Sequence, residues 1–219
     1  MVPGLNAVID LSHHNQEGLG RPIDYDSARV DGVAGVIYKA TQGTAMRDMT
    51  YADNRSAARA AGLMWGAYHF GTVGDGVAQA DFFLNTVKPD DDTLLALDLE
   101  DYVVKKGAPP RLMPREEAER FVARIAEQTG RFPGVYTRRN LADDALGITP
   151  ASELAHCWLW LAAYSSKPKL PAAWADWALW QYTGDDLGPL QPHAVSGAGV
   201  CDRDTFNGEL PALQALWGH

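Results

Sequence analysis

The alternation of short apolar strands with helices constrains the fold of this chain more than any other feature of its sequence. Strand patterns at residues 5–10, 34–40, 63–70, 93–100 and 134–137 alternate with helical patterns, the longest at 51–61, 77–87 and 115–129. Three more strand patterns follow at 158–164, 177–183 and 200–206, without long helices between them. Strands joined by helices favour a parallel sheet that can close. We therefore expect one α/β domain over residues 1–219, an irregular TIM-like barrel.

Residues 93–100 read as a buried strand that ends in two acids. Alternate side chains of a strand share a face, so Asp98 and Glu100 point to the same side as Leu94 and Ala96. Their Cβ atoms then lie roughly 6–7 Å apart. Each carboxyl raises the cost of ionising the other, so one can stay protonated while its neighbour is charged. This pairing is typical of glycoside hydrolases.

Polar and aromatic side chains collect where the predicted strands end, which is the end that carries the chemistry in parallel barrels. Aromatic rings stack on sugar rings, while acids and amides bind sugar hydroxyls. His69 fits either a hydrogen-bonding role there or a satisfied core position. We predict Asp98 and Glu100 as the catalytic pair, and a substrate-binding set composed of Asp10, Asp202, Lys39, Tyr68, His69, Tyr136, Trp180 and Gln181.

Charge and motifs exclude several classes of function. A net charge of −9 and a pI near 5.0 disfavour binding to nucleic acid or to a membrane surface. The sequence has no glycine-rich phosphate loop and no G-x-S-x-G motif, which disfavours nucleotide enzymes and serine hydrolases. His13 and His14 lack partners at metal-ligand spacing, so we expect neither metal nor cofactor. Cys157 and Cys201 are expected to be buried free thiols.

Seven sequence blocks, in this order, resemble the family-25 glycoside hydrolases, which are lysozymes that cleave the β-1,4 bond between N-acetylmuramic acid and N-acetylglucosamine in peptidoglycan. They cover residues 8–12, 37–41, 66–70, 97–100, 160–162, 179–182 and 202–208. The resemblance extends over essentially the whole chain. It implies a (β/α)₅β₃ barrel, with Glu100 as general acid and Asp98 as its essential partner. It also matches Asp10 and Asp202 to two further acids of the cleft.

Gln42 departs from the family, which usually has glutamate at this position. The amide keeps the size and hydrogen bonding of glutamate but loses its charge, so we expect tuning of activity rather than inactivation. A catalytically silent glycan-binding barrel is the alternative that this departure supports. A third reading is a hydrolase in which the four acids Asp10, Asp98, Glu100 and Asp202 hold Mg²⁺ or Mn²⁺ through oxygen atoms.

The position of both acids on one strand bears on the mechanism. Asp98 is poorly placed to attack the sugar from the opposite face, which favours attack by the 2-acetamido oxygen of the substrate, with Asp98 orienting that group. Direct attack on the sugar by Asp202 or Asp10 is the alternative mechanism.

Glycan strands of peptidoglycan are the expected partner, bound by a monomer without a wall-binding module. The N-terminus shows neither a basic segment nor a long apolar one. We therefore expect synthesis in the cytoplasm without a signal peptide, and action on the wall after lysis or specialised export. The sequence does not distinguish a phage lysin (endolysin) from an autolysin or an exported effector.

Overall fold

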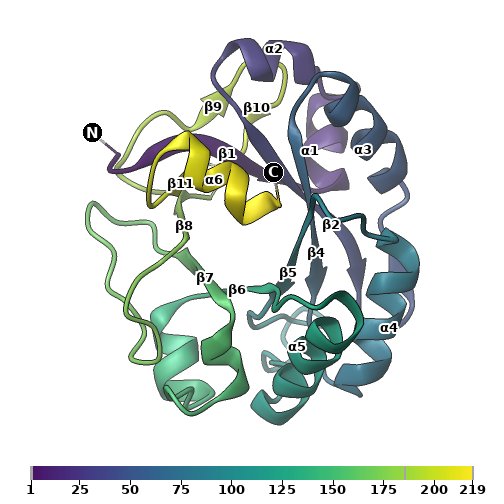
Figure 1. Cartoon of the computed structure of the whole chain (residues 1–219), viewed down its shortest axis with the longest axis vertical. Helices are drawn as coiled ribbons and strands as arrows, with labels where there is room; N and C mark the ends of the chain where they lie inside the picture. The colour runs from purple at the N-terminus through teal and green to yellow at the C-terminus, as the bar shows by residue number, and fades with distance from the viewer. Residues whose placement is uncertain (1, 185, 219) are drawn as a thin grey trace.

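The computed structural model describes residues 2–184 and 186–218, and within them eight strands close into a barrel (Figure 1). The strands, in their order around the barrel, are β1 (Leu5–Leu11), β2 (Gly35–Gln42), β4 (Met64–Phe70), β5 (Thr93–Asp98), β6 (Gly134–Thr137), β7 (Trp158–Ala162), β8 (Leu179–Thr183) and β11 (Asp202–Phe206). Neighbours from β1 to β8 pair in parallel. The predicted α/β barrel, with five βα units followed by three strands, is confirmed.

Strand β11 runs antiparallel to both of its neighbours, β8 and β1. The described residues between β8 and β11 contain no helix, only the short hairpin of β9 (Ala194–Val195) and β10 (Gly199–Val200). A parallel return requires a long crossover, usually a helix, whereas an antiparallel one does not. The beginning of β11 therefore lies at the same end of the barrel as the ends of the parallel strands. We call this end the mouth.

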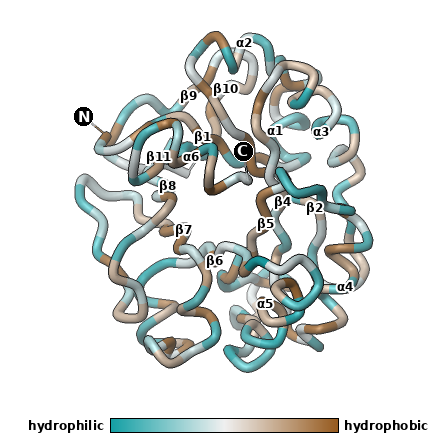
Figure 2. The backbone as a smooth tube through the Cα atoms, in the orientation of Figure 1, coloured by the Kyte–Doolittle hydropathy of each residue, from teal (hydrophilic) through white to brown (hydrophobic). Residues whose placement is uncertain are grey.

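Helices surround the barrel and cover the outer face of its sheet (Figure 1). They are α1 (His13–Leu19), α2 (Tyr25–Val30), α3 (Tyr51–Ala60), α4 (Gly76–Val87) and α5 (Arg115–Thr129), with short helical turns at Leu141–Ala145 and Glu153–His156 before β7. In Figure 2 the strands are mostly hydrophobic and the outward loops hydrophilic. The apolar core between sheet and helices therefore holds the strands in place.

Helix α1 begins directly after β1, and side chains cap its first turn. The Ser12 hydroxyl accepts from the backbone N–H of His14, and the Asn15 side chain accepts from the backbone N–H of Ser12. These reciprocal bonds satisfy backbone donors that the first turn of a helix leaves free. The chain therefore enters a helix directly after β1.

The end of the barrel opposite the mouth is filled with apolar side chains. Val8, Ile37, Leu94 and Leu179 point inward there, together with Leu213 and Trp217 of helix α6 (Leu210–Trp217). Gly35 leaves room for this helix, because an added Cβ would lie 3.2 Å from the Trp217 ring. Helix α6 crosses this end in Figure 1. Apolar packing closes the barrel at one end, so a ligand can enter at the mouth.

Two further observations concern the cysteines and the length of the helices. Cys157 and Cys201 are buried free thiols, as predicted. Among the helices of the described residues, none has both the length and the apolar character needed to span a bilayer.

Candidate active site

Four carboxyl groups meet inside the mouth, where the apolar filling of the barrel ends. Asp10 is next to last in β1, Asp98 ends β5, Glu100 follows two residues later, and Asp202 begins β11. Asp10 and Asp202 are paired directly across the antiparallel strands. The acids line a cavity of about 70 Å³, which we call the catalytic cavity, together with Tyr68, Tyr136, Trp160 and Gln181. The structure thus brings together the four acids named from the sequence.

Asp98 and Glu100 differ in how deeply they are buried. Asp98 is 6% exposed, whereas Glu100 is partly exposed at the edge of the cavity. Burial raises the pKa of Asp98 well above its usual value, and the neighbouring Glu100 charge raises it further. Burial also raises the pKa of Glu100, while the positive charge of Arg138 opposes that shift. The pair therefore holds a proton at pH values where exposed acids are ionised, and Glu100 stands where it can deliver one.

Lys39 projects into the mouth beside the acid pair. Its Nζ donates to Gln42 Oε1 at 2.9 Å and lies 4.6 Å from the centroid of the Phe70 ring. Burial lowers the pKa of Lys39, and the charges of Asp98 and Glu100 oppose this. The residue that departs from the family pattern, Gln42, binds the ammonium group through a neutral oxygen. The Lys39 charge consequently remains available to the acids.

A glutamine at the mouth links two tyrosines to Asp10. The hydroxyl groups of Tyr136 and Tyr164 each donate to Gln181 Oε1 at 2.8 Å, and Gln181 Nε2 donates to Asp10 Oδ2 at 2.7 Å. These bonds fix which end of the amide faces Asp10. Burial raises the pKa of Asp10 well above its usual value, and the charges of Asp202 and Asp204 raise it further. The hydrogen bond from Gln181 lowers this pKa and so opposes the shift. The network orients the wall of the cavity opposite Glu100.

Asp204 is a fifth acid on the inner face of the barrel, and the site prediction omitted it. It points inward from β11, is fully buried, and accepts from Trp160 Nε1 at 2.5 Å through Oδ1. Burial is the main cause that raises the pKa of Asp204 to about 8, and the charge of Asp202 raises it further. Alternation from Asp202 would have placed Asp204 on the inward face.

Asp204 should make the protein less stable as pH rises. Below about pH 4 the carboxyl is protonated in both states, and between about pH 4 and 8 only the folded state keeps the proton, so the free energy of unfolding falls across this range. We expect Asp204→Asn, whose amide oxygen can still accept from Trp160, to have a flatter stability profile. Urea unfolding from pH 4 to 8 measures this, and an unchanged slope would contradict the assigned pKa.

Two residues of the predicted binding set do not reach the mouth. His69 is fully buried on the helix side of β4, where its Nδ1 bonds Thr41 Oγ1 at 2.7 Å and its ring stacks on Phe121. Burial lowers its pKa to about 4. Trp180 is fully buried too, and its Nε1 donates to the backbone oxygen of Ala163 at 2.8 Å. His69 follows Tyr68, and Trp180 precedes Gln181; Tyr68 and Gln181 point into the barrel. Because adjacent residues of a strand face opposite sides, His69 and Trp180 point outward.

The position of His69 gives a prediction that separates packing from substrate binding. His69→Ala would leave a cavity against Phe121 and remove the partner of buried Thr41, so we expect a loss of about 3 kcal/mol in the free energy of unfolding. The KM of the folded fraction should stay near that of the unchanged protein. Denaturant unfolding and steady-state kinetics test this, and a large rise in KM at unchanged stability would return His69 to the site.

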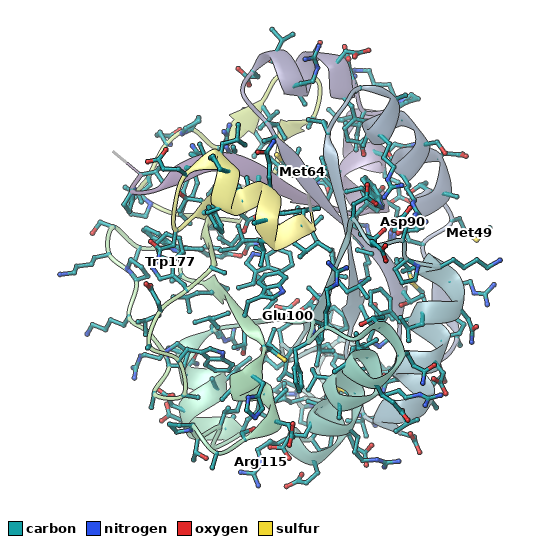
Figure 3. The ribbon with its side chains drawn as sticks, in the orientation of Figure 1. Met49, Met64, Asp90, Glu100, Arg115 and Trp177 are labelled. Atoms are coloured by element: carbon teal, nitrogen blue, oxygen red, sulfur yellow. The ribbon has the colours of Figure 1, made fainter. Side chains whose placement is uncertain are left out.

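Two larger cavities share lining residues with the catalytic cavity. A cavity of about 480 Å³ shares Glu100 and Tyr136 with it, and a second of about 460 Å³ shares Asp202. In Figure 3 Glu100 lies near the centre of the ring of strands. The acids thus line three cavities that share residues from one to the next, and we call these cavities together the cleft.

Comparison with known proteins agrees with this geometry. The chain is 30% identical over 219 residues to lysozyme M1 of Streptomyces globisporus, covering 95% of this chain and 70% of that protein. A crystal structure of a bacterial lysozyme from Streptomyces coelicolor superposes with a TM-score of 0.82 at 28% identity, over 100% of this chain and 99% of that one. A family GH25 lysozyme from Aspergillus fumigatus gives a TM-score of 0.77 at 28% identity, over 98% and 99% of the two chains.

A family model supplies the assignment. The model described as glycosyl hydrolases family 25 matches residues 9–188, which is most of the chain and includes Asp10, Asp98 and Glu100. Together with the barrel and the acid-lined cleft at its mouth, this match shows that the chain belongs to the glycosyl hydrolases of family 25.

Proposed function

We propose that this protein is a lysozyme that hydrolyses the β-1,4 bond between N-acetylmuramic acid and N-acetylglucosamine in peptidoglycan, with Glu100 as general acid. The observation that carries the proposal is the Asp98–Glu100 pair, which lines one cavity in the middle of the cleft. Glycoside hydrolysis requires a protonated carboxyl beside the leaving oxygen and a second carboxyl beside the sugar. Lysozyme M1 and the other relatives have names that agree with this substrate.

Glu100 gives its proton to the glycosidic oxygen as the bond to the anomeric carbon breaks. Its partial exposure allows contact with a bound glycan, and the burial that raises its pKa keeps the proton available. The departing sugar leaves as an alcohol. Glu100, now ionised, can then take a proton from the water that completes the hydrolysis.

Asp98 acts on the side of the sugar that becomes positively charged. Its carboxylate stabilises that charge, and one of its oxygens, Oδ1, has no hydrogen-bond donor among the described residues. A free acceptor suits the N–H of the substrate's 2-acetamido group. Orienting that group would direct its carbonyl oxygen onto the anomeric carbon, so that the substrate supplies the nucleophile. Tyr68, which lines the same cavity, offers an aromatic face to the sugar.

Lys39 favours hydrolysis without a metal ion. Its ammonium group interacts with Asp98 and Glu100, which are two of the oxygen ligands that a cation would need. A second positive charge at this point would be repelled by the first. Lys39 instead limits how far the pKa of each acid rises.

The products of digestion test the proposed bond. Purified peptidoglycan is digested, reduced with borohydride and examined by mass spectrometry, because reduction marks the sugar that carries the new reducing end. We expect reduced N-acetylmuramic acid, with Glu100→Gln as the inactive control. Reduced N-acetylglucosamine would show that the other glycosidic bond is cut, and absence of any release would support a silent glycan-binding barrel.

The protein is proposed to work as a monomer, since one chain supplies every residue that lines the catalytic cavity. Its wall-directed relatives include an autolytic lysozyme of Clostridium acetobutylicum, of which this chain covers 52%. Delivery to the wall by lysis or by specialised export stays a prediction.

A further inference from the structure

A positively charged pocket adjoins Glu100 in a chain whose net charge is −9. Two loops form it, one after β6 and one after β7, and we call it the cationic pocket. Its volume is about 480 Å³, and its polar lining includes Arg138, Arg139, Asn140, Tyr164, Lys167 and Lys169. Because Glu100 and Tyr136 line both this pocket and the catalytic cavity, whatever occupies it lies next to the bond being cut.

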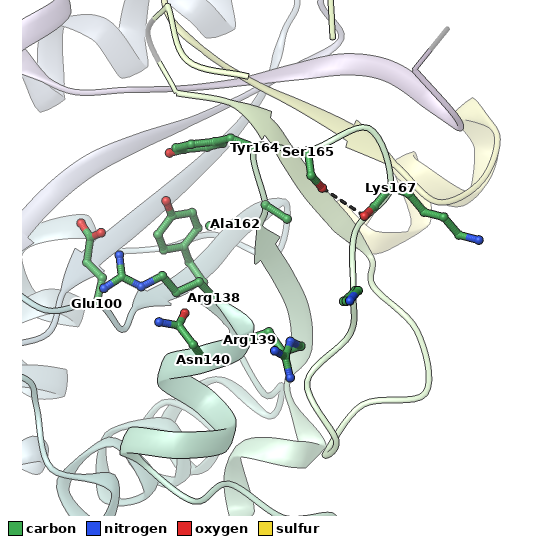
Figure 4. Close-up of a pocket in the computed structure, with 11 residues that line it drawn as sticks. Glu100, Arg138, Arg139, Asn140, Ala162, Tyr164, Ser165 and Lys167 are labelled. Carbon is green, nitrogen blue, oxygen red and sulfur yellow. Dashed lines mark hydrogen bonds between the residues drawn. The ribbon is translucent and has the colours of Figure 1, made fainter. Parts of the chain in front are cut away.

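The positive charge of the pocket is only partly neutralised. Arg138 donates to Asp101 at 2.5 Å, and Arg139 lies 3.4 Å from Asp143. Lys167 and Lys169 are exposed, and neither forms an ion pair with any residue that the structure describes. In Figure 4 Arg138 is directed toward Glu100, whereas Lys167 points away from it on the far side. The cations thus extend from the acid pair to the outer edge of the cleft.

The opposite side of the cleft has a different character. The cavity of about 460 Å³ that shares Asp202 is lined by polar residues such as Ser12 and Asn15, and its described lining contains neither lysine nor arginine. Sugar hydroxyls need only hydrogen-bonding groups of this kind. Clustered cations on one side alone therefore indicate that the ligand carries anionic groups there.

We propose that the cationic pocket binds carboxylates of the peptide that is attached to the muramyl sugar beside the cleaved bond. This inference rests on the proposed function, because in peptidoglycan the muramyl sugars bear peptides with free carboxylates. A peptide that leaves the sugar ring at the acid pair would run outward along the cations. Arginine can bind a carboxylate through two parallel hydrogen bonds, and the mobile lysine side chains can follow its position.

The test compares strands that carry peptides with strands whose peptides have been removed, where each muramyl sugar keeps only its lactyl carboxylate. Glycan strands freed of phosphate-bearing wall polymers are used intact, or after an amidase has removed their peptides, and kcat/KM is measured on each. We expect a higher value on the peptide-bearing strands. In Lys167→Gln/Lys169→Gln the ratio of the two values should fall about fivefold, the effect of losing two exposed charge pairs. Raised salt should also lower the wild-type ratio.

A matched control separates local from general charge effects. Lys105→Gln/Lys106→Gln removes the same charge from exposed residues of the loop between β5 and α5, outside the pocket, and should keep the wild-type ratio. An equal fall in this control would overturn the inference, as would an unchanged ratio in the Lys167/Lys169 variant. A third substrate, whose peptide carboxylates have been amidated, should be cleaved like the peptide-free strands. If the enzyme still preferred peptide-bearing strands after their carboxylates had been amidated, the inference would also be overturned.

Three further outcomes have distinct meanings. Cleavage of both substrates by the unchanged protein at equal rates would overturn this inference and leave the proposed function standing. Cleavage of neither would overturn the proposed function, and the inference with it. A preference that appears only on strands retaining phosphate-bearing wall polymer would assign the pocket to phosphate rather than to peptide carboxylates, and would overturn the inference as stated.

Discussion

Replacement of Glu100 by glutamine is expected to lower kcat/KM on a soluble peptidoglycan fragment by about three orders of magnitude. The amide keeps the shape of the side chain and its place at the edge of the catalytic cavity, but it has no acidic proton to give the leaving oxygen. Binding of the glycan should change little, because the amide still forms hydrogen bonds. Steady-state kinetics and a direct binding measurement together distinguish loss of chemistry from loss of affinity.

Glu116→Gln is the matched control for this experiment. It makes the same chemical change at an exposed position on α5, where the carboxyl contacts the guanidinium group of neighbouring Arg115, and it should leave activity unaltered. If Glu100→Gln retained activity within about tenfold of the unchanged protein, the lost transition-state stabilisation would be only ~1.4 kcal/mol. The assignment of Glu100 as general acid would then be wrong.

Replacement of Asp98 by asparagine should be nearly as damaging, with a loss of about two to three orders of magnitude in kcat/KM. The neutral amide cannot stabilise the positive charge that develops on the sugar. It also exchanges a pure acceptor for a group that can present a donor to the 2-acetamido N–H. Asp53→Asn, an exposed position on α3, provides the control with the same change of charge.

The pH dependence of the Asp98 variant should also shift. The charge of Glu100 raises the pKa of Asp98, and because repulsion is mutual, an ionised Asp98 opposes the ionisation of Glu100. Activity requires protonated Glu100, so it is lost as pH rises through the upper pKa of the pair. Without the Asp98 charge this pKa falls, and the alkaline limb of kcat/KM should move to lower pH. A limb that stays in place would show that the two carboxyls titrate independently.

Much of the site could be predicted from local sequence. Alternation along residues 93–100 put Asp98 and Glu100 on one face, and the structure places Leu94 and Ala96 inside the barrel below them. Period-2 alternation is a property of the extended backbone itself, so it holds whatever the surrounding fold. The order of strands and helices likewise predicted a barrel, because parallel strands need crossovers that the sequence displays as helical patterns.

The same alternation separates the aromatic and histidine residues into two groups. Tyr68 and His69 are neighbours, as are Trp180 and Gln181, and the two members of each pair cannot both face the interior of the barrel. Residue type alone suggested a sugar-binding role for all of them. The structure keeps Tyr68 and Gln181 at the mouth and buries the other two among outward-facing side chains.

The sequence by itself determined the acid pair and the succession of elements, whereas the tertiary structure decided which distant residues complete the site. Asp202 reaches Asp10 because β11 runs antiparallel, and that direction depends on hydrogen bonds to β8 and β1. The bond from Trp160 to Asp204 and the one from Gln181 to Asp10 join residues 44 and 171 positions apart. Local propensities determine strands and faces, but such register depends on which strands pair when the barrel closes.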